Sequence, residues 1–182
     1  MSTALQYDTA IEKCKDIFLK KTRDYGTSWR VLRNISIVDQ IFIKALRIRT
    51  IQEKKTQMVG DSITSEFVGI VNYGVIGLIQ IELNDPAVID LSPDTVASLY
   101  DKHIAKVRKL MEGKNHDYGE AWRDMSQESF ADLILVKLLR IRQILANDGK
   151  TIISEGIEAN FHDIINYAVF ALILIDEGKH QG

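Results

Sequence analysis

The feature that most constrains this chain is an internal repeat in its sequence. The segment Asp-Tyr-Gly-x-x-Trp-Arg begins at Asp24 and returns at Asp117. Other residues match at the same spacing, and after a single insertion they match at a spacing one residue longer. The matched pairs include Asp24 with Asp117, Tyr25 with Tyr118, Trp29 with Trp122, Arg30 with Arg123, Lys44 with Lys137, Arg47 with Arg140, and Asn72 with Asn166. A repeat of this length indicates two copies of one structural unit.

The stretch between the two copies has a different composition. Both prolines of the chain lie there among aspartate and serine residues. Proline interrupts a helix interior, and the pair Ser92-Pro93 is typical of a helix start. We therefore expect a first helical repeat over residues 1–85, a linker over 86–98 and a second helical repeat over 99–182, with the two repeats packed as one globular unit.

Apolar residues recur at helical spacing within each copy, as at Ile11, Cys14 and Phe18. The pattern predicts an all-α fold, a helical bundle of two tandem pseudo-symmetric repeats. Each repeat should have about three helices and an Asp-Tyr-Gly turn in which a left-handed glycine closes the first helix. The expected second and third helices span roughly residues 36–54, 61–84, 128–147 and 154–178. The third helices are apolar nearly all round, so we expect them to be central or to face another subunit.

Composition limits the classes of function. The chain has 182 residues and a net charge of −2, because 23 Lys and Arg nearly balance 25 Asp and Glu, which argues against bulk nucleic-acid binding. The longest apolar stretch, residues 164–175, is interrupted by Asn166 and is shorter than the roughly 20 residues of a membrane span. The single cysteine leaves no partner for an intramolecular disulfide, which fits a reducing compartment. We expect a cytoplasmic protein without a membrane partner.

Two pairs of cations are candidates for phosphate binding. Lys137 and Arg140 stand three residues apart, so they share a helix face. Lys44 and Arg47 repeat this arrangement in the first copy. Two cations on one face suit a single phosphate group. The alternative is that these side chains are solvated or pair with neighbouring aspartates.

The Asp-Tyr-Gly segments and the repeated asparagines offer further binding candidates. Tyrosine and tryptophan have flat apolar faces with one polar group, so they can stack on a nucleobase. The candidates are Asp24, Tyr25, Trp29, Asn72, Asp117, Tyr118, Trp122 and Asn166. The alternative for the tryptophans is that they fill the gap between helices while the glycine sets the turn.

The second repeat carries acidic groups that the first lacks. Glu158 and Asp163, together with Glu155, can ligate magnesium through oxygen, with His162 as an optional nitrogen ligand. Magnesium held by carboxylates and substrate phosphates would make Asp163 and Glu158 catalytic. Because the first repeat has Gly69 at the position of Asp163, we expect one working site, centred on the second repeat. The alternative for Glu158 is a surface hydrogen bond to His162.

Residues 114–122, Lys-Asn-His-Asp-Tyr-Gly-Glu-Ala-Trp, resemble the signature of the nucleotide modification associated domain 1 family of bacteria and phages. The resemblance continues through Lys137, Arg140 and residues 163–167, Asp-Ile-Ile-Asn-Tyr, and it covers most of both copies. It implies two tandem domains of this family and a link to phage or bacterial nucleotide metabolism.

The residues and the resemblance leave three functions open. The first is nucleotide or phosphometabolite handling by a magnesium-dependent enzyme similar to the all-α nucleoside triphosphate pyrophosphohydrolases. Those enzymes hold magnesium with two acidic pairs, and this chain has one such pair, Glu155-x-x-Glu158. The second is a non-catalytic nucleotide-binding accessory protein. The third is a helical scaffold that forms homo-oligomers through its apolar helices. The sequence lacks P-loop, Rossmann, Cys-x-x-Cys and Gly-x-Ser-x-Gly motifs, so those site types have no support.

Overall fold

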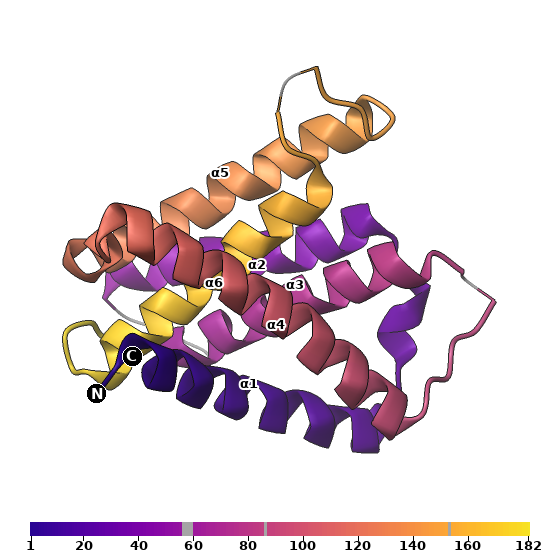
Figure 1. The fold of residues 1–182 in the computed structure, drawn as a ribbon, viewed down its shortest axis with the longest axis horizontal. Helices are drawn as coiled ribbons and strands as arrows, with labels where there is room; N and C mark the ends of the chain where they lie inside the picture. The colour runs from indigo at the N-terminus through magenta and orange to yellow at the C-terminus, as the bar shows by residue number, and fades with distance from the viewer. Residues whose placement is uncertain (56–59, 86, 153) are drawn as a thin grey trace.

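A computed structural model describes residues 1–55, 60–85, 87–152 and 154–182 of the chain. These residues form six α-helices and two short 3₁₀-helices and contain no strand, which confirms the all-α prediction (Figure 1). The elements are α1 (Thr3–Tyr25), η1 (Ser28–Val31), α2 (Asn34–Lys54), α3 (Ile63–Leu83), α4 (Pro93–Tyr118), η2 (Ala121–Asp124), α5 (Gln127–Ala146) and α6 (Ile157–Asp176). Each repeat therefore contributes three long helices, with a 3₁₀ turn after the first.

Local sequence explains where most of the helices begin. Four helices follow a serine whose side chain accepts a hydrogen bond from the backbone N–H three residues further on. These serines are Ser2, Ser62, Ser92 and Ser126. A serine in this place satisfies a backbone donor that the helix leaves free. Pro93 follows Ser92 as the first residue of α4, as predicted, so residues 93–98 of the expected linker are helical.

Glycine ends the first helix of each repeat. The helices α1 and α4 stop at Tyr25 and Tyr118, and Gly26 and Gly119 follow with φ values of 69° and 63°. Gly119 has the left-handed helical conformation that was predicted, whereas Gly26, with ψ of −145°, takes another conformation open to glycine. Each glycine N–H donates to the carbonyl four residues earlier, which closes the helix.

The helices α3 and α6 form the centre of the molecule, where they cross and pack against each other more extensively than any other described pair (Figure 1). Their close approach depends on two glycines of α3. A Cβ on Gly74 would lie 2.6 Å from Cγ1 of Ile165, and a Cβ on Gly77 would lie 2.8 Å from Cζ of Phe161. The helix α2 packs on α3, α5 packs on α6, and α1 and α4 contact both central helices. The central position predicted for the third helices is confirmed.

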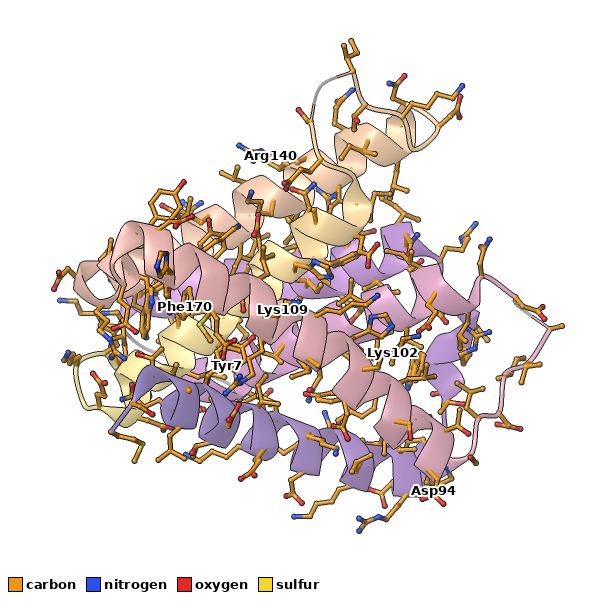
Figure 2. The ribbon with its side chains drawn as sticks, viewed as in Figure 1. Tyr7, Asp94, Lys102, Lys109, Arg140 and Phe170 are labelled. Atoms are coloured by element: carbon orange, nitrogen blue, oxygen red, sulfur yellow. The ribbon has the colours of Figure 1, made fainter. Side chains whose placement is uncertain are left out.

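Two buried hydrogen bonds cross between the repeats. The hydroxyl of Tyr7, which points from α1 into the interior (Figure 2), donates to Oδ1 of Asn166 in α6 over 2.7 Å. In the same way, the hydroxyl of Tyr100 in α4 donates to Oδ1 of Asn72 in α3 over 2.8 Å. The amide nitrogen of each asparagine donates to a backbone carbonyl in the first helix of its own repeat. Each asparagine thus joins the two repeats, and the pair of contacts follows an approximate twofold symmetry.

Replacing Tyr7 with phenylalanine is expected to lower the free energy of unfolding by about 1–3 kcal/mol, because Oδ1 of the buried Asn166 then loses its donor. Tyr100→Phe is expected to cost about the same, since its environment repeats that of Tyr7. Urea denaturation measures both effects. Tyr118→Phe serves as the control, because Tyr118 is 75% exposed. A core variant as stable as the wild type would contradict the crossed pairing.

The helices α3 and α6 are long and apolar enough to cross a membrane, judged by length and composition alone. Of their most apolar windows, 67% and 72% are buried inside the fold. Core helices of soluble proteins pass the same test, so these two helices are weak evidence for a membrane span.

Candidate functional site

A pocket of about 760 Å³ lies between the C-terminal half of α5, the start of α6 and the loop that joins them. The described residues around it include three cations, Lys137, Arg140 and Lys150, and one carboxylate, Glu155. Neutral polar side chains and two isoleucines make up the rest of the described lining. The lining of this pocket therefore carries more positive than negative charge.

The buried carboxylate of Asp163 in α6 holds two lysines, of which Lys137 lines this pocket. Its Oδ1 accepts a hydrogen bond of 2.8 Å from Nζ of Lys114 in α4, and its Oδ2 lies 2.8 Å from Nζ of Lys137 in α5. Burial raises the pKa of the Asp163 carboxyl, but the hydrogen bonds from the two lysines outweigh burial and hold the pKa below its usual value. Asp163 is therefore ionised at neutral pH, and it neutralises part of the lysine charge.

Arg140 differs from these lysines, because it has no hydrogen bond or ion pair with any residue that the structure describes. Its side chain extends from α5 (Figure 2) and is exposed to solvent. Arginine presents a planar fork of N–H donors that matches two oxygens of a phosphate or carboxylate. The guanidinium of Arg140 is thus able to bind an anion in the pocket.

The matching cations of the first repeat are paired inside the protein. The NH1 group of Arg47 lies 2.9 Å from Oε1 of Glu66, a buried residue of α3. Nζ of Lys44 lies 3.7 Å from Oε2 of the same carboxylate. Acidic partners were the alternative for these cations, although Glu66 is not one of the aspartates expected from the sequence. In each repeat, then, a carboxylate on the third helix holds at least one of the predicted cations.

The three predicted magnesium ligands are not brought together. Glu155 lines the pocket described above, Glu158 lines a separate pocket, and Asp163 is held by two lysines. Within the described ranges, no group of three or more His, Cys, Asp or Glu residues is placed to hold a metal ion. Oε1 of Glu158 lies 3.8 Å from Nε2 of His162, which is too long for a hydrogen bond. As placed, the three carboxylates do not form one site, and magnesium binding stays a prediction.

The two repeated tryptophans pack inside the protein. The buried ring of Trp122 stacks on Phe170 with 4.2 Å between the ring centroids. The guanidinium carbon of Arg123 lies 4.4 Å from the centroid of the same indole. Trp29 is partly buried and packs near Phe18, with 6.2 Å between the centroids. This is the gap-filling role that was the alternative to stacking on a nucleobase.

The other predicted binding residues lie outside this pocket. The exposed side chains at the two Asp-Tyr-Gly turns are Asp24, Tyr25, Asp117 and Tyr118. Asn72 and Asn166 are buried and make the hydrogen bonds that cross between the repeats. The recurrence of the asparagines is thus explained by the core. The structure gives the exposed aspartates and tyrosines no comparable role in packing.

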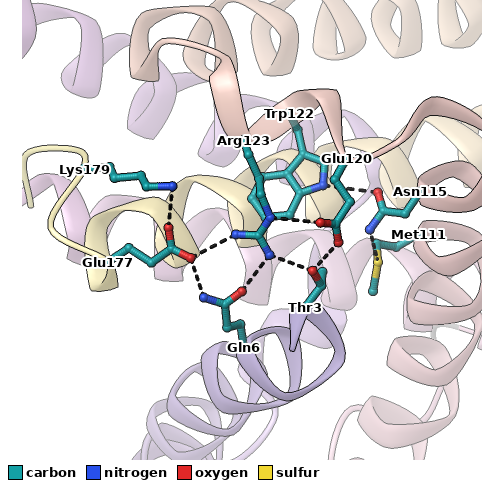
Figure 3. Close-up of polar contacts among 9 residues, drawn as sticks. All are labelled: Thr3, Gln6, Met111, Asn115, Glu120, Trp122, Arg123, Glu177 and Lys179. Carbon is teal, nitrogen blue, oxygen red and sulfur yellow. Dashed lines mark hydrogen bonds and ion pairs between the residues drawn. The ribbon is translucent and has the colours of Figure 1, made fainter. Parts of the chain in front are cut away.

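The arginines that end the two repeated segments, Arg30 and Arg123, hold neighbouring parts of the fold together by hydrogen bonds. Arg123 donates to Glu120 over 3.0 Å and to Glu177 over 2.9 Å (Figure 3). It also donates to Gln6 of α1 over 2.7 Å, so it ties η2 to the start of α1 and the end of α6. Arg30 donates in the same manner to backbone carbonyls of the connection between α3 and α4. These arginines therefore recur for a structural reason.

A comparison with protein-family models identifies the unit that is repeated. The model of nucleotide modification associated domain 1 matches residues 21–81 and again residues 114–175, together more than half of the chain. The chain belongs to the nucleotide modification associated domain 1 family. The two matches confirm the two tandem copies of this domain, and the second match contains Arg140 and the Asp163 carboxylate with its two lysines. No curated protein and no solved structure matches the chain.

Three residues of the site in this nucleotide modification associated domain 1 protein were not predicted from the sequence. Lys114 matches Lys21 of the first repeat, and that recurrence was a usable signal. Lys150 lies in the loop after α5, where no periodic pattern indicates the direction of a side chain. Asn160 stands where the first repeat has Glu66. The importance of its uncharged side chain becomes clear only when the structure shows that Glu66 pairs with Arg47.

Proposed function

We propose that this member of the nucleotide modification associated domain 1 family binds a phosphorylated small molecule in the pocket between α5 and α6, and that nucleotides are the class it takes. The observation that carries the proposal is the guanidinium of Arg140, which lines the pocket and has no partner among the described residues. The description of the family supports the nucleotide class.

The charges around the pocket suit a phosphate group. Phosphate carries close to two negative charges near neutral pH, so it binds best where several cations converge. Arg140 supplies a planar fork of donors, Lys137 is held in place by Asp163, and Lys150 adds a third cation from the loop. The volume of about 760 Å³ falls within the roughly 300–1,000 Å³ that is usual for small-molecule pockets.

We propose binding rather than hydrolysis, because the predicted catalytic residues lack a shared site. Both carboxylate oxygens of Asp163 face lysine ammonium groups, and Glu158 lines a different pocket. The role that this geometry supports for Asp163 is to position Lys137. The scaffold alternative has less support, because α3 and α6 bury most of their apolar surface inside the chain.

Replacing Arg140 with glutamine is expected to weaken nucleotide binding about tenfold to a hundredfold, since a hydrogen bond to a charged group contributes about 1.5–3 kcal/mol. Isothermal titration calorimetry with nucleoside mono-, di- and triphosphates, each with and without Mg²⁺, measures the affinity. Arg49→Gln is the matched control, because Arg49 of α2 is an exposed cation outside the pocket lining.

Equal losses of affinity for the Arg140 and Arg49 variants would show that the effect is general electrostatics and would contradict the proposed pocket. Absence of binding across the whole nucleotide panel would contradict nucleotide binding itself. Turnover of a nucleotide in the presence of Mg²⁺ would replace the binding proposal with the enzymatic one.

A further inference from the structure

The two repeats differ in the position of the acid that faces their cations. At the spacing that relates α3 to α6, Glu66 corresponds to Asn160, and Gly69 corresponds to Asp163. Each third helix therefore has one carboxylate at this pair of positions. The first repeat has it at the earlier position, as Glu66, and the second repeat has it three residues later, as Asp163. Three residues are close to one helical turn, a shift of roughly 4.5 Å along the helix axis.

In the first repeat, the carboxylate holds the arginine. Glu66 is buried and lies 2.9 Å from NH1 of Arg47. Lys44 fills the space beside Gly69, since a Cβ there would lie 2.8 Å from Cε of this lysine. An aspartate at position 69 would therefore require Lys44 to move. The charges of the first repeat are thus satisfied within the protein by one buried acid.

In the second repeat, the carboxylate holds the lysines instead. Asp163 forms ion pairs with Lys114 and Lys137, and each lysine Nζ lies 2.8 Å from one of its carboxylate oxygens. The residue one turn earlier is Asn160, which lines the pocket and donates from Nδ2 to the carbonyl of Gly156 over 2.8 Å. A neutral amide cannot neutralise a guanidinium. Arg140, the counterpart of Arg47, is consequently left without an ion pair among the residues described.

We propose that the residue at position 160 decides whether this site binds an anion. The neutral Asn160 leaves the guanidinium of Arg140 available to an anion. In the first repeat, Glu66 forms an ion pair with the matching Arg47, so that copy does not bind an anion. This inference rests on the proposed function, and it adds that each chain has one anion site, in the second repeat.

The shape of the side chain at position 160 matters less than its charge. A glutamate there would stand where Glu66 stands in the first repeat, within reach of the matched arginine. It would neutralise Arg140 and repel an incoming phosphate at the same time. Glutamine has the same shape as glutamate without the charge, so the pair Asn160→Glu and Asn160→Gln isolates the electrostatic effect.

Isothermal titration calorimetry with inorganic pyrophosphate at low ionic strength tests the proposal. The wild type is expected to bind one pyrophosphate per chain. Asn160→Glu is expected to bind at least tenfold more weakly than Asn160→Gln. Ser98→Glu, which adds the same charge at an exposed position of α4, is expected to bind as tightly as the wild type.

A double-mutant cycle shows whether position 160 acts through Arg140. In the Arg140→Gln background, the affinities of the Asn160→Glu and Asn160→Gln variants are expected to differ less than they do with Arg140 present, because only the direct repulsion between the acid and the phosphate remains. Circular dichroism melts of each variant confirm that the chain is folded before titration.

The outcomes separate the two proposals. Two pyrophosphates per chain, or equal affinities of the Asn160→Glu and Asn160→Gln variants while Arg140→Gln binds weakly, would overturn the role of position 160 and leave the pocket in place. A wild-type chain that binds neither pyrophosphate nor any nucleotide would overturn both.

Discussion

Replacing Gly77 with leucine is expected to lower the free energy of unfolding by about 3 kcal/mol or more, the upper end of the usual cost of overpacking a core. A Cβ on Gly77 would lie 2.8 Å from Cζ of Phe161, and both residues are buried where α3 meets α6. Side chains do not pack at that distance, so a leucine has to push the two central helices apart. Among the described helices, α3 and α6 contribute the most buried apolar residues, and each belongs to a different repeat, so the strain spreads to both repeats.

Urea denaturation measures this effect, and Gly113→Leu is a matched control. Gly113 lies in α4 with open space around the position of its Cβ. Leucine favours a helix over glycine by roughly 0.5–1 kcal/mol, so the control is expected to be slightly more stable than the wild type. If the Gly77 variant were as stable as the wild type, the close approach of α3 and α6 would be wrong.

Replacing Asp163 with asparagine is expected to lower the free energy of unfolding by about 3 kcal/mol at neutral pH. Removing one partner of a buried ion pair costs about 3–5 kcal/mol, and the lower value applies here because Lys114 is half exposed. The asparagine leaves Lys137, whose side chain is 14% exposed, without its carboxylate. Asp16→Asn is the control, because the pair of Asp16 with Lys20 is mostly exposed and should contribute less than about 1 kcal/mol.

The same substitution predicts a change in the pH dependence of stability. The pKa of Asp163 is lower in the folded chain than its usual value, because the two lysines outweigh the effect of burial. Its contribution is therefore present above the unfolded pKa, about 3.9, and is lost as the pH falls through the folded pKa. The difference in stability between the wild type and Asp163→Asn should be constant from about pH 7 to pH 5 and shrink below about pH 4. A difference that does not change with pH would mean that Asp163 is not held by the lysines.

The helices were predictable because their signals are local. Periodic apolar residues fix the faces of the helices, Ser92-Pro93 starts α4, and Gly119 ends it. The duplication adds a second constraint, since any element expected in one copy is expected in the other. Burial of α3 and α6 followed from their apolar composition on all sides. These predictions needed no knowledge of which helices touch.

The site was less predictable because its partners are distant in the sequence. Asp163 meets Lys114 from another helix, so a carboxylate that resembles a metal ligand along the chain is paired with cations in space. Recurrence between the copies also had more than one cause. The asparagine recurs as Asn166 because the core needs its hydrogen bonds. The arginine recurs as Arg47 and Arg140, but Arg47 pairs with a buried acid and Arg140 lines a pocket. Sequence spacing identifies such residues but does not distinguish the causes.

The crossed hydrogen bonds of Tyr7 and Tyr100 have a consequence for how such a fold can exist. A single repeat would lack the partner that the structure gives to its tyrosine hydroxyl and to Oδ1 of its asparagine, and a second copy supplies both. Joining both copies in one polypeptide turns that encounter into an intramolecular one, at an effective concentration that is of millimolar order for short flexible connections. The two repeats of this chain can therefore form these contacts without an encounter between molecules, whereas two separate copies would form them to an extent that depends on their concentration.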